Sequence, residues 1–346
     1  MGLGLTCSAV PGLSSSCLPD PLPSESWRSN TNHSDFDAFA DKVTGFVGSR
    51  PLLHEWPACR TALLDDLPRE KPWVLSLPGI SCLAVGGDSD DAIPVAAAWT
   101  ALRKAAHLLD AVQDRDDVTI TGFDTPAKII NLATGMIFAA YHFLDCVQTH
   151  PGSARQVIAV FSEAAFCSSL GQHQGLDQAH GDLPLGEALA AYWRSVISKS
   201  GSLFRMATAG GAVAGAGSAH LVTSLGDYGN CLGVILQVID DCRDVLRHPD
   251  TADYEVSLPL LLLLLTTHKG PSRHQVTRLL SPGACRERQA LFEVLHRANV
   301  PAIITDVLLE WRRRALDSLK SLEHPSVVQM LEGILDHVLT DLPSTG

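Results

Sequence analysis

The chain has 346 residues, of which 46% are hydrophobic and 18% are charged. A chain of this length and composition can bury a large core, which excludes a wholly disordered or collagen-like protein. It carries 26 basic and 38 acidic residues, a formal net charge of −12. A protein whose main task is binding nucleic acid needs a basic surface instead. We therefore expect a globular protein that does not bind nucleic acid.

The first part of the chain, residues 1–34, is rich in Ser, Pro and Gly and has no periodic apolar pattern, so we predict a disordered tail. From Phe36 onward the apolar residues follow a helical period, and signs of strands are weak. We therefore predict an all-α fold in which residues 35–346 form one domain. The expected helices span residues 35–48, 51–66, 92–114, 126–149, 153–170, 185–217, 221–247, 258–268, 273–280, 286–298, 301–320 and 325–341.

Two sequence features bear on the cellular compartment. The nine cysteines form no C-x-x-C pair, and their odd number does not suit a set of disulfides, so we predict free thiols in a reducing, cytoplasmic compartment. The longest aliphatic run, Leu258–Leu265, contains Pro259 and is far shorter than the roughly 20 residues of a membrane-spanning helix. The sequence thus predicts no transmembrane segment.

Two apolar segments that we predict to be helical carry closely spaced aspartates. Asp110 and Asp114 lie four residues apart in the first, and Asp240 and Asp244 have the same spacing in the second, with Asp241 between them. Residues four apart project from one face of a helix. Carboxylates among apolar residues are costly to bury unpaired, whereas Mg²⁺ ions bound together with a diphosphate would neutralise them. These five aspartates are therefore the predicted metal ligands.

A lysine lies between the two acidic segments, on a helical stripe that is otherwise apolar. The stripe consists of Tyr192, Val196, Lys199, Leu203 and Met206. The ammonium group of such a lysine either extends outward to solvent or faces an anion. Because two acidic clusters of metal-binding type accompany it, we expect Lys199 to face a diphosphate.

These pieces, in this order, resemble the motifs of the trans-isoprenyl diphosphate synthase (polyprenyl synthetase) superfamily. Residues Gly229–Asp244 resemble its second Asp-rich motif, with Leu236 in place of a phenylalanine, and Asp110–Asp114 resemble the first, with Ala111 in place of an aspartate. Three further matches are Lys199-Ser200 with the Lys-Thr pair that contacts diphosphate, Gly171–Asp177 with the GQxxD segment, and Ser257–Leu260 with the TLP segment.

The resemblance implies an isoprenoid-synthase-type helical bundle around a central active-site cavity, and a homodimer. It also implies three bound Mg²⁺ ions and an allylic prenyl diphosphate as substrate. Ionisation of that substrate to a carbocation would involve the catalytic residues Asp110, Asp114, Asp240 and Lys199.

The resemblance further implies the residues that contact the substrate. Besides Lys199 these are Gln237 and Arg243 in the second motif, and Ala105 and Ala106, which lie just before the first. In the family, bulky aromatic residues at these last two positions stop the tunnel that holds the growing chain. Two methyl groups leave that tunnel open, so we expect a preference for geranylgeranyl diphosphate or a longer allylic substrate.

Three departures from the family pattern concern a second diphosphate site. No Arg-Arg pair follows Asp114, and residues 251–256 lack the usual Gly-Lys step. Only the segment 69–72 remains of the basic segment that chain-elongating members carry near the N-terminus. We therefore expect the site for isopentenyl diphosphate to be eroded. This favours a class I terpene synthase, in which the carbocation cyclises or eliminates in a site that excludes water.

Two alternatives remain open. A chain-elongating prenyltransferase would bind isopentenyl diphosphate through other basic residues, such as Arg69, Lys71 and Arg103. A catalytically inactive partner subunit of a prenyl synthase would account for Ala111 in the first motif, although the intact second motif and Lys199 argue against it.

Overall fold

The computed structural model describes residues 33–67, 71–114, 123–177, 184–247, 258–267 and 288–342. The described residues are mostly helical and contain no β-strand, which confirms the predicted all-α fold. The predicted tail lies outside the described residues, except for His33 and Ser34, which begin α1. The predicted helix 273–280 also lies outside the described residues. The helices are α1 (His33–Gly48), α2 (Pro51–His54), α3 (Pro57–Asp66), α4 (Pro72–Leu83), η3 (Ser89–Ala92), α5 (Ile93–Asp114), α6 (Pro126–Leu144), α7 (Ser153–Asp177), α8 (Leu185–Val196), η5 (Ile197–Gly201), α9 (Ser202–Ala214), α10 (Ala219–Arg247), α11 (Leu258–Thr267), α13 (Arg288–Arg297), α14 (Val300–Ser318), η6 (Leu319–Ser321) and α15 (Pro325–Thr340).

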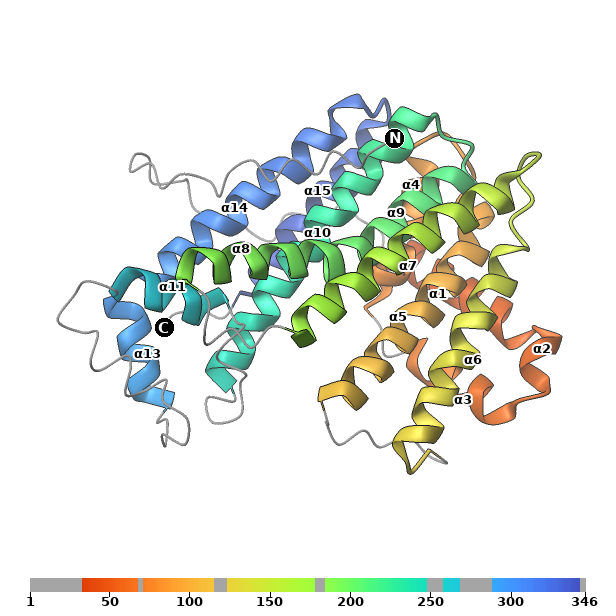
Figure 1. The fold of residues 1–346 in the computed structure, drawn as a ribbon. Coiled ribbons are helices and arrows are strands. Elements are labelled where there is room, and N and C mark those ends of the chain that lie inside the picture. The colour runs from red at the N-terminus through yellow and green to blue at the C-terminus, as the bar shows by residue number, and fades with distance from the viewer. Residues whose placement is uncertain are drawn as a thin grey trace.

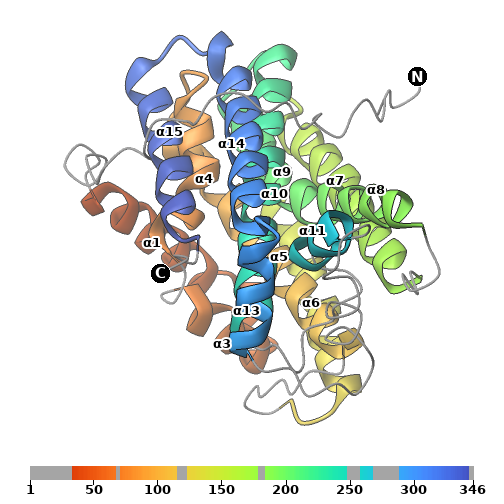
Figure 2. The ribbon, with the colours of Figure 1, turned by 90° about the vertical axis from the view of Figure 1, so that its left-hand side faces the viewer.

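Long helices packed side by side form the centre of the fold. α9 packs against α4, α7 and α10, while α10 also packs against α14, and α5 runs along α6 (Figure 1). Viewed from the side, α11 lies next to α8 and α10 (Figure 2). The C-terminal ends of α5 and α10, which carry the two acidic segments, both lie on the lower side of the molecule in Figure 1. The fold therefore brings the predicted metal ligands to one side.

Helix α4 is absent from the elements that the sequence predicts. Ten of its residues are buried, so its apolar residues surround the helix and give no amphipathic period. Pro72 occupies the first turn, where no backbone N–H is needed, whereas Pro78 lies inside the helix and would normally interrupt it. The backbone of Pro78 packs directly against Gly211 of α9, where any side chain would collide with it. Tertiary packing therefore determines this helix.

Other helix boundaries differ from the expected ones. The predicted helix 51–66 is divided into α2 and α3, because Trp56 leaves the helical region of backbone conformation before Pro57. α6 ends at Leu144, earlier than predicted, and α7 continues to Asp177, later than predicted. The predicted helix 185–217 is interrupted by one π-helical turn, η5.

The cysteines of the described residues are all free, as predicted. Four of them are buried, and burial raises the pKa of the Cys59 thiol to about 11 and that of Cys82, Cys231 and Cys242 to about 12. A thiol that stays protonated is a poor nucleophile and a poor metal ligand. These four cysteines therefore act as small apolar residues of the core.

Candidate active site

Lys199 faces the first acidic segment. Its ammonium group donates to both carboxylate oxygens of Asp110, at 2.8 and 3.0 Å, and joins the turn after α8 to the end of α5. The two side chains are 35% and 29% exposed, so the pair is half-buried but open to solvent on one side. In this structure Lys199 faces a carboxylate, and the diphosphate expected from the sequence stays a prediction. The side chain of Asp114 lies outside the described part of the structure.

The backbone that carries Lys199 is a π-helical turn, η5. A π-helical turn is wider than an α-helical one and is often found at functional sites. The Ser168 hydroxyl of α7 donates to the backbone oxygen of Lys199 at 3.0 Å, and the Asn230 side chain of α10 donates to that of Ile197 at 3.4 Å. The turn is therefore held from both neighbouring helices, which fixes the direction in which Lys199 leaves the backbone.

Asp241 joins three helices at the second acidic segment. Its carboxylate accepts from the Tyr192 hydroxyl of α8 at 2.6 Å and from the Gln237 amide of α10 at 2.9 Å, and also from the backbone of Leu258 in α11. Loss of hydration raises the pKa of Asp241 to about 6, although these hydrogen bonds partly oppose the rise. The Ser200 hydroxyl in η5 donates to the other end of the Gln237 amide at 2.6 Å. A continuous hydrogen-bonded chain thus connects Asp241 with the turn of Lys199.

The other aspartates of this segment face outward. Asp240 and Asp244 are exposed, and Asp240 accepts from Arg243 at 3.2 Å. Arg243 also donates to the backbone oxygen of Asp341 at 2.9 Å and lies 3.3 Å from its carboxylate, which Lys71 approaches to 2.7 Å. Burial raises the pKa of Asp341, but Lys71 and Arg243 outweigh that effect and hold the pKa below its usual range. Acidic and basic side chains therefore alternate along the edge of the site.

Sequence reasoning missed two members of these networks. The sequence pattern places Tyr192 only on an apolar stripe, and nothing in it points to Asp341. Asp341 lies next to the C-terminal end of α15, 270 residues from Lys71, and no motif marks it. Tyr192 could have been noticed, because a buried tyrosine hydroxyl needs a partner and the second acidic segment offers carboxylates.

Several of the remaining predicted residues lie in α5 or contact its C-terminal end. Ala105 is 1% exposed and belongs to the hydrophobic core, whereas Ala106 is half-buried on the helix face of Asp110. Gln172 in the GQxxD-like segment donates to Gln113 at 2.9 Å, which ties α7 to the end of α5. Of the basic residues proposed for a second diphosphate, Arg69 lies outside the described residues, and Arg103 lies over the ring of Trp99.

The carboxylates of the two acidic segments suit a hard cation such as Mg²⁺, which keeps water or substrate oxygens among its ligands. Within the described ranges, no group of three or more His, Cys, Asp or Glu side chains lies close enough to hold an ion. Each acidic segment instead offers single carboxylates, and Mg²⁺ is typically bound through one or two carboxylates with substrate phosphates completing its shell. Asp240 and Asp244, which are exposed, have oxygens that could serve in this way. Both oxygens of Asp110 accept from Lys199, so Asp110 could bind a cation only once Lys199 turns to another anion, whereas both oxygens of Asp241 accept from Tyr192 and Gln237.

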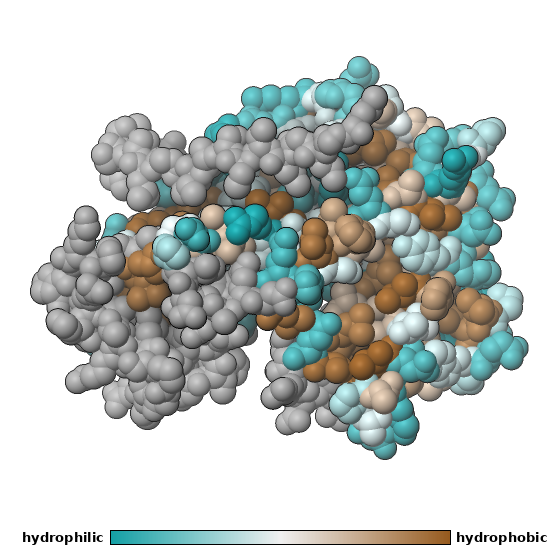
Figure 3. Space-filling model, viewed as in Figure 1, coloured by the Kyte–Doolittle hydropathy of each residue, from teal (hydrophilic) through white to brown (hydrophobic). Residues whose placement is uncertain are grey.

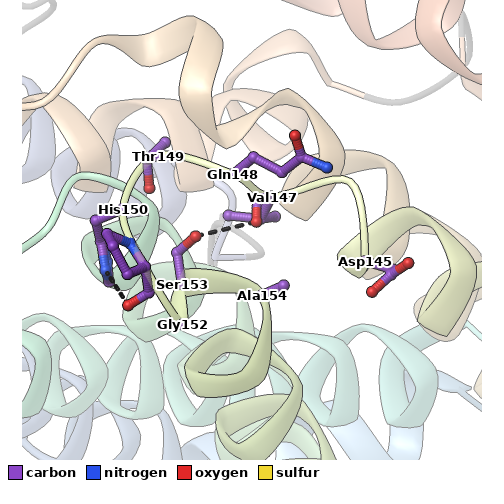
Figure 4. Close-up of a pocket in the computed structure, with 9 residues that line it drawn as sticks. Asp145, Val147, Gln148, Thr149, His150, Gly152, Ser153 and Ala154 are labelled. Carbon is purple, nitrogen blue, oxygen red and sulfur yellow. Dashed lines mark hydrogen bonds between the residues drawn. The ribbon is translucent and has the colours of Figure 1, made fainter.

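The pocket shown in Figure 4 lies away from this site. It is formed by the turn between α6 and α7, residues 145–154, where Ser153 donates to the backbone oxygen of Val147 and His150 contacts the backbone oxygen of Pro151. None of its lining residues belongs to an acidic segment. We therefore do not assign it to the active site.

Comparison with solved structures confirms the fold. The geranylgeranyl pyrophosphate synthetase of Pyrococcus horikoshii matches 89% of this chain and 97% of its own, with a TM-score of 0.75 and 16% identity. A polyprenyl synthase of Caulobacter crescentus, solved with calcium and isoprenyl diphosphate, matches 93% of this chain and 99% of its own, with a TM-score of 0.74 and 19% identity. Both confirm the predicted isoprenoid-synthase-type bundle.

Curated relatives are similar to this chain in sequence as well. The short chain isoprenyl diphosphate synthase of Methanothermobacter thermautotrophicus is 25% identical over 279 residues, 76% of this chain and 84% of the relative. The heterodimeric geranylgeranyl pyrophosphate synthase large subunit 2 of Arabidopsis thaliana is 28% identical over 207 residues, 57% of this chain and only 54% of the relative. The polyprenyl synthetase family model matches residues 80–257, which include both acidic segments and Lys199. The chain therefore belongs to the polyprenyl synthetase family of isoprenoid synthases, as its motifs indicate.

Proposed function

We propose that this protein is a prenyltransferase, which ionises an allylic prenyl diphosphate and couples the carbocation to isopentenyl diphosphate. The observation that carries the proposal is the Lys199–Asp110 pair at the end of α5, in a fold that brings the acidic end of α10 to the same side. The curated relatives are named as prenyl diphosphate synthases, which supports chain elongation over the terpene synthase that the sequence favoured.

Each residue of the site has a role in this proposal. Lys199 leaves Asp110 and donates to the diphosphate, so that the positive charge of its ammonium group still faces a negative charge. Asp110, Asp114, Asp240 and Asp244 would hold Mg²⁺ ions. The resemblance to the family implies three such ions. Bound there, Mg²⁺ would stabilise the negative charge that grows on the departing diphosphate.

A terpene synthase is the second candidate, and one observation favours it. Lys71 belongs to the remnant of the basic N-terminal segment, yet it forms an ion pair with Asp341, which also approaches Arg243. The Asp341 carboxylate thus neutralises the positive charge of Lys71 and Arg243, which would otherwise be available to bind a second diphosphate. An enzyme that binds a single diphosphate would need no such cations.

Product analysis separates these candidates. The protein is incubated with Mg²⁺ and geranyl, farnesyl or geranylgeranyl diphosphate, with and without labelled isopentenyl diphosphate. We expect longer prenyl diphosphates only when isopentenyl diphosphate is present. Hydrocarbon or alcohol released without it would establish the terpene synthase. No product under any condition would contradict both and support an inactive partner subunit.

Replacing Lys199 with alanine should weaken both binding and ionisation. The substitution removes a charge-assisted hydrogen bond to diphosphate, worth about 1.5–3 kcal/mol, so we expect kcat/KM to fall by about 10- to 100-fold. The measurement is steady-state kinetics with the preferred allylic substrate. Lys42→Ala is the control, because Lys42 forms an exposed ion pair with Asp90, which lies just before the opposite, N-terminal end of α5. Unchanged kinetics in Lys199→Ala would make the Lys199–Asp110 pair purely structural.

The wall before the first acidic segment should set the length of the substrate. We expect the wild type to prefer geranylgeranyl diphosphate or a longer substrate, and phenylalanine at Ala105 or Ala106 to shift kcat/KM toward farnesyl and geranyl diphosphate. Because Ala105 is buried, its replacement also overpacks the core, at a cost of about 1–3 kcal/mol, whereas Ala106 is only half-buried and should tolerate the larger side chain better. Thermal unfolding of both variants separates the two effects. A wild type that prefers geranyl diphosphate would contradict the prediction.

We also propose that the protein is a homodimer, joined through an apolar patch on α6 and α7. Phe138 and Phe166 are 68% and 71% exposed, and Ile130 and Leu170 accompany them. Tyr141 in α6 contacts Ser162 in α7. Phe138 lies about one turn before Tyr141 and Phe166 about one turn after Ser162, so we expect the two rings to lie near each other on these helices. Hydrophobic side chains gather over this part of the surface (Figure 3).

α6 is also the one helix of the described residues that is long and apolar enough to cross a membrane by length and composition.

Charges on this patch should separate the dimer. We expect the double variant Phe138→Glu/Phe166→Glu to be monomeric in analytical ultracentrifugation, because burying the two carboxylates without partners would be costly. Leu52→Glu is the control, since Leu52 is an exposed apolar residue of α2. A monomeric wild type, or a double variant that stays dimeric, would contradict this interface. Binding of the wild type to lipid vesicles would point to a membrane surface instead.

Two broader proposals follow from the described residues. One cluster of buried apolar side chains extends from Phe36 in α1 to Leu339 in α15, which supports a single domain over residues 35–346. The free cysteines support a reducing compartment such as the cytoplasm.

A further inference from the structure

The hydrogen-bonded chain from Tyr192 to Ser200 has a direction. Tyr192 and Gln237 both approach the carboxylate of Asp241, at 2.6 and 2.9 Å, and an ionised carboxylate can only accept hydrogen bonds. The Gln237 amide must therefore turn its NH₂ group to Asp241. Its carbonyl oxygen then faces Ser200, 2.6 Å away, and the Ser200 hydroxyl must donate to it.

This direction determines what Ser200 can offer a ligand. A hydroxyl has one proton and two lone pairs, and the proton is already used by Gln237. Ser200 can then only accept a hydrogen bond from a bound molecule. The resemblance led us to expect that Lys199 and Ser200 both contact diphosphate. The chain of hydrogen bonds leaves Lys199 as the donor of that pair.

We propose that Tyr192 and Asp241 are positioning residues, which orient the Gln237 amide and so keep Ser200 a hydrogen-bond acceptor beside the substrate. This inference rests on the proposed function for its catalytic consequence. Tyr192 is buried and holds Asp241 from α8, while Asp241 holds Gln237 on its own helix, so neither needs to touch the substrate.

A spectroscopic test detects the orientation without any turnover. The protein is labelled with ¹⁵N-glutamine, and the side-chain amide signal of Gln237 is identified by its loss in Gln237→Leu. We expect Tyr192→Phe and Asp241→Asn to shift this signal, because each changes a hydrogen bond around the amide. Tyr228→Phe is the matched control, since Tyr228 is also buried in the core and donates to a backbone oxygen, that of Leu331, in another part of the fold.

A kinetic test detects the consequence. Tyr192→Phe should lower kcat by about 3- to 10-fold with little change in KM, as expected for the loss of one hydrogen bond. If Tyr192 acts through Ser200, the double variant with Ser200→Ala should be no slower than Ser200→Ala alone. Inhibition by inorganic diphosphate should weaken in Lys199→Ala and stay unchanged in Ser200→Ala. The control Tyr228→Phe should show none of the coupling to Ser200→Ala.

The outcomes separate this inference from the proposed function. A Gln237 signal unmoved in both variants, additive effects of Tyr192→Phe and Ser200→Ala, or weaker diphosphate inhibition in Ser200→Ala would each overturn it. If the wild type turns over no prenyl diphosphate, the proposed function fails and the catalytic role of Tyr192 fails with it. The spectroscopic test still decides whether Tyr192 and Asp241 orient Gln237.

Discussion

Alanine at Asp110 or Asp240 is expected to lower kcat by about a thousandfold or more while the protein stays folded. A metal-bound leaving group gains several kcal/mol of charge stabilisation, and each 1.4 kcal/mol corresponds to about tenfold in rate. For the same reason a chelator should abolish activity, and added Mg²⁺ should restore it. The measurements are single-turnover rates and the heat released when Mg²⁺ and inorganic diphosphate bind together.

A control lies on the same helix as Asp240. Asp227 in α10 is 56% exposed, close to the 58% of Asp240, and it also pairs with an arginine, Arg205. Asp227→Ala removes a similar carboxylate far from the acidic segment and should keep its activity. Wild-type-like turnover in Asp240→Ala, or an unchanged heat of Mg²⁺ binding in both site variants, would show that these carboxylates hold no metal.

Local patterns carried most of the fold prediction. Helical periodicity, with caps such as Thr125 before Pro126, identified nearly all of the described helices because those signals lie within one helix. The stripe of Lys199 left open whether the lysine extends to solvent or faces an anion, and in the structure it faces Asp110. Helix α4 escaped prediction because burial on all sides removes the period that marks a helix.

Contacts between distant segments could not be read from the sequence. Tyr192 and Asp241 are separated by 49 residues and Lys71 and Asp341 by 270, and only packing of the helices brings each pair together. The π-helical turn is a further case, because α8, η5 and α9 follow one another without a break in the apolar pattern. The turn is held by Ser168 and Asn230 from neighbouring helices.

The second large effect is expected from glycine substitutions beside the π-helical turn η5. Gly171 of α7 and Gly233 of α10 lie on two sides of η5. A Cβ atom at Gly171 would lie 2.6 Å from the backbone nitrogen of Lys199, and one at Gly233 would lie 2.9 Å from the carbonyl carbon of Ser200 and closer still to its oxygen. These neighbours are backbone atoms, which cannot rotate away as a flexible side chain can. Any side chain at either position must therefore displace the turn.

We expect Gly233→Ala to lower kcat/KM by about 100-fold, because a shift of about 1 Å at a positioning element can cost that much. It should also destabilise the fold by about 1–3 kcal/mol through overpacking. Gly211→Ala is the control for instability, since Gly211 is crowded by the backbone of Pro78 but lies away from η5. Gly45→Ala in α1 meets no atom within 4 Å and should be neutral or stabilising. If Gly233→Ala loses no more activity than Gly211→Ala at equal loss of stability, the position of the Lys199 turn does not limit the reaction.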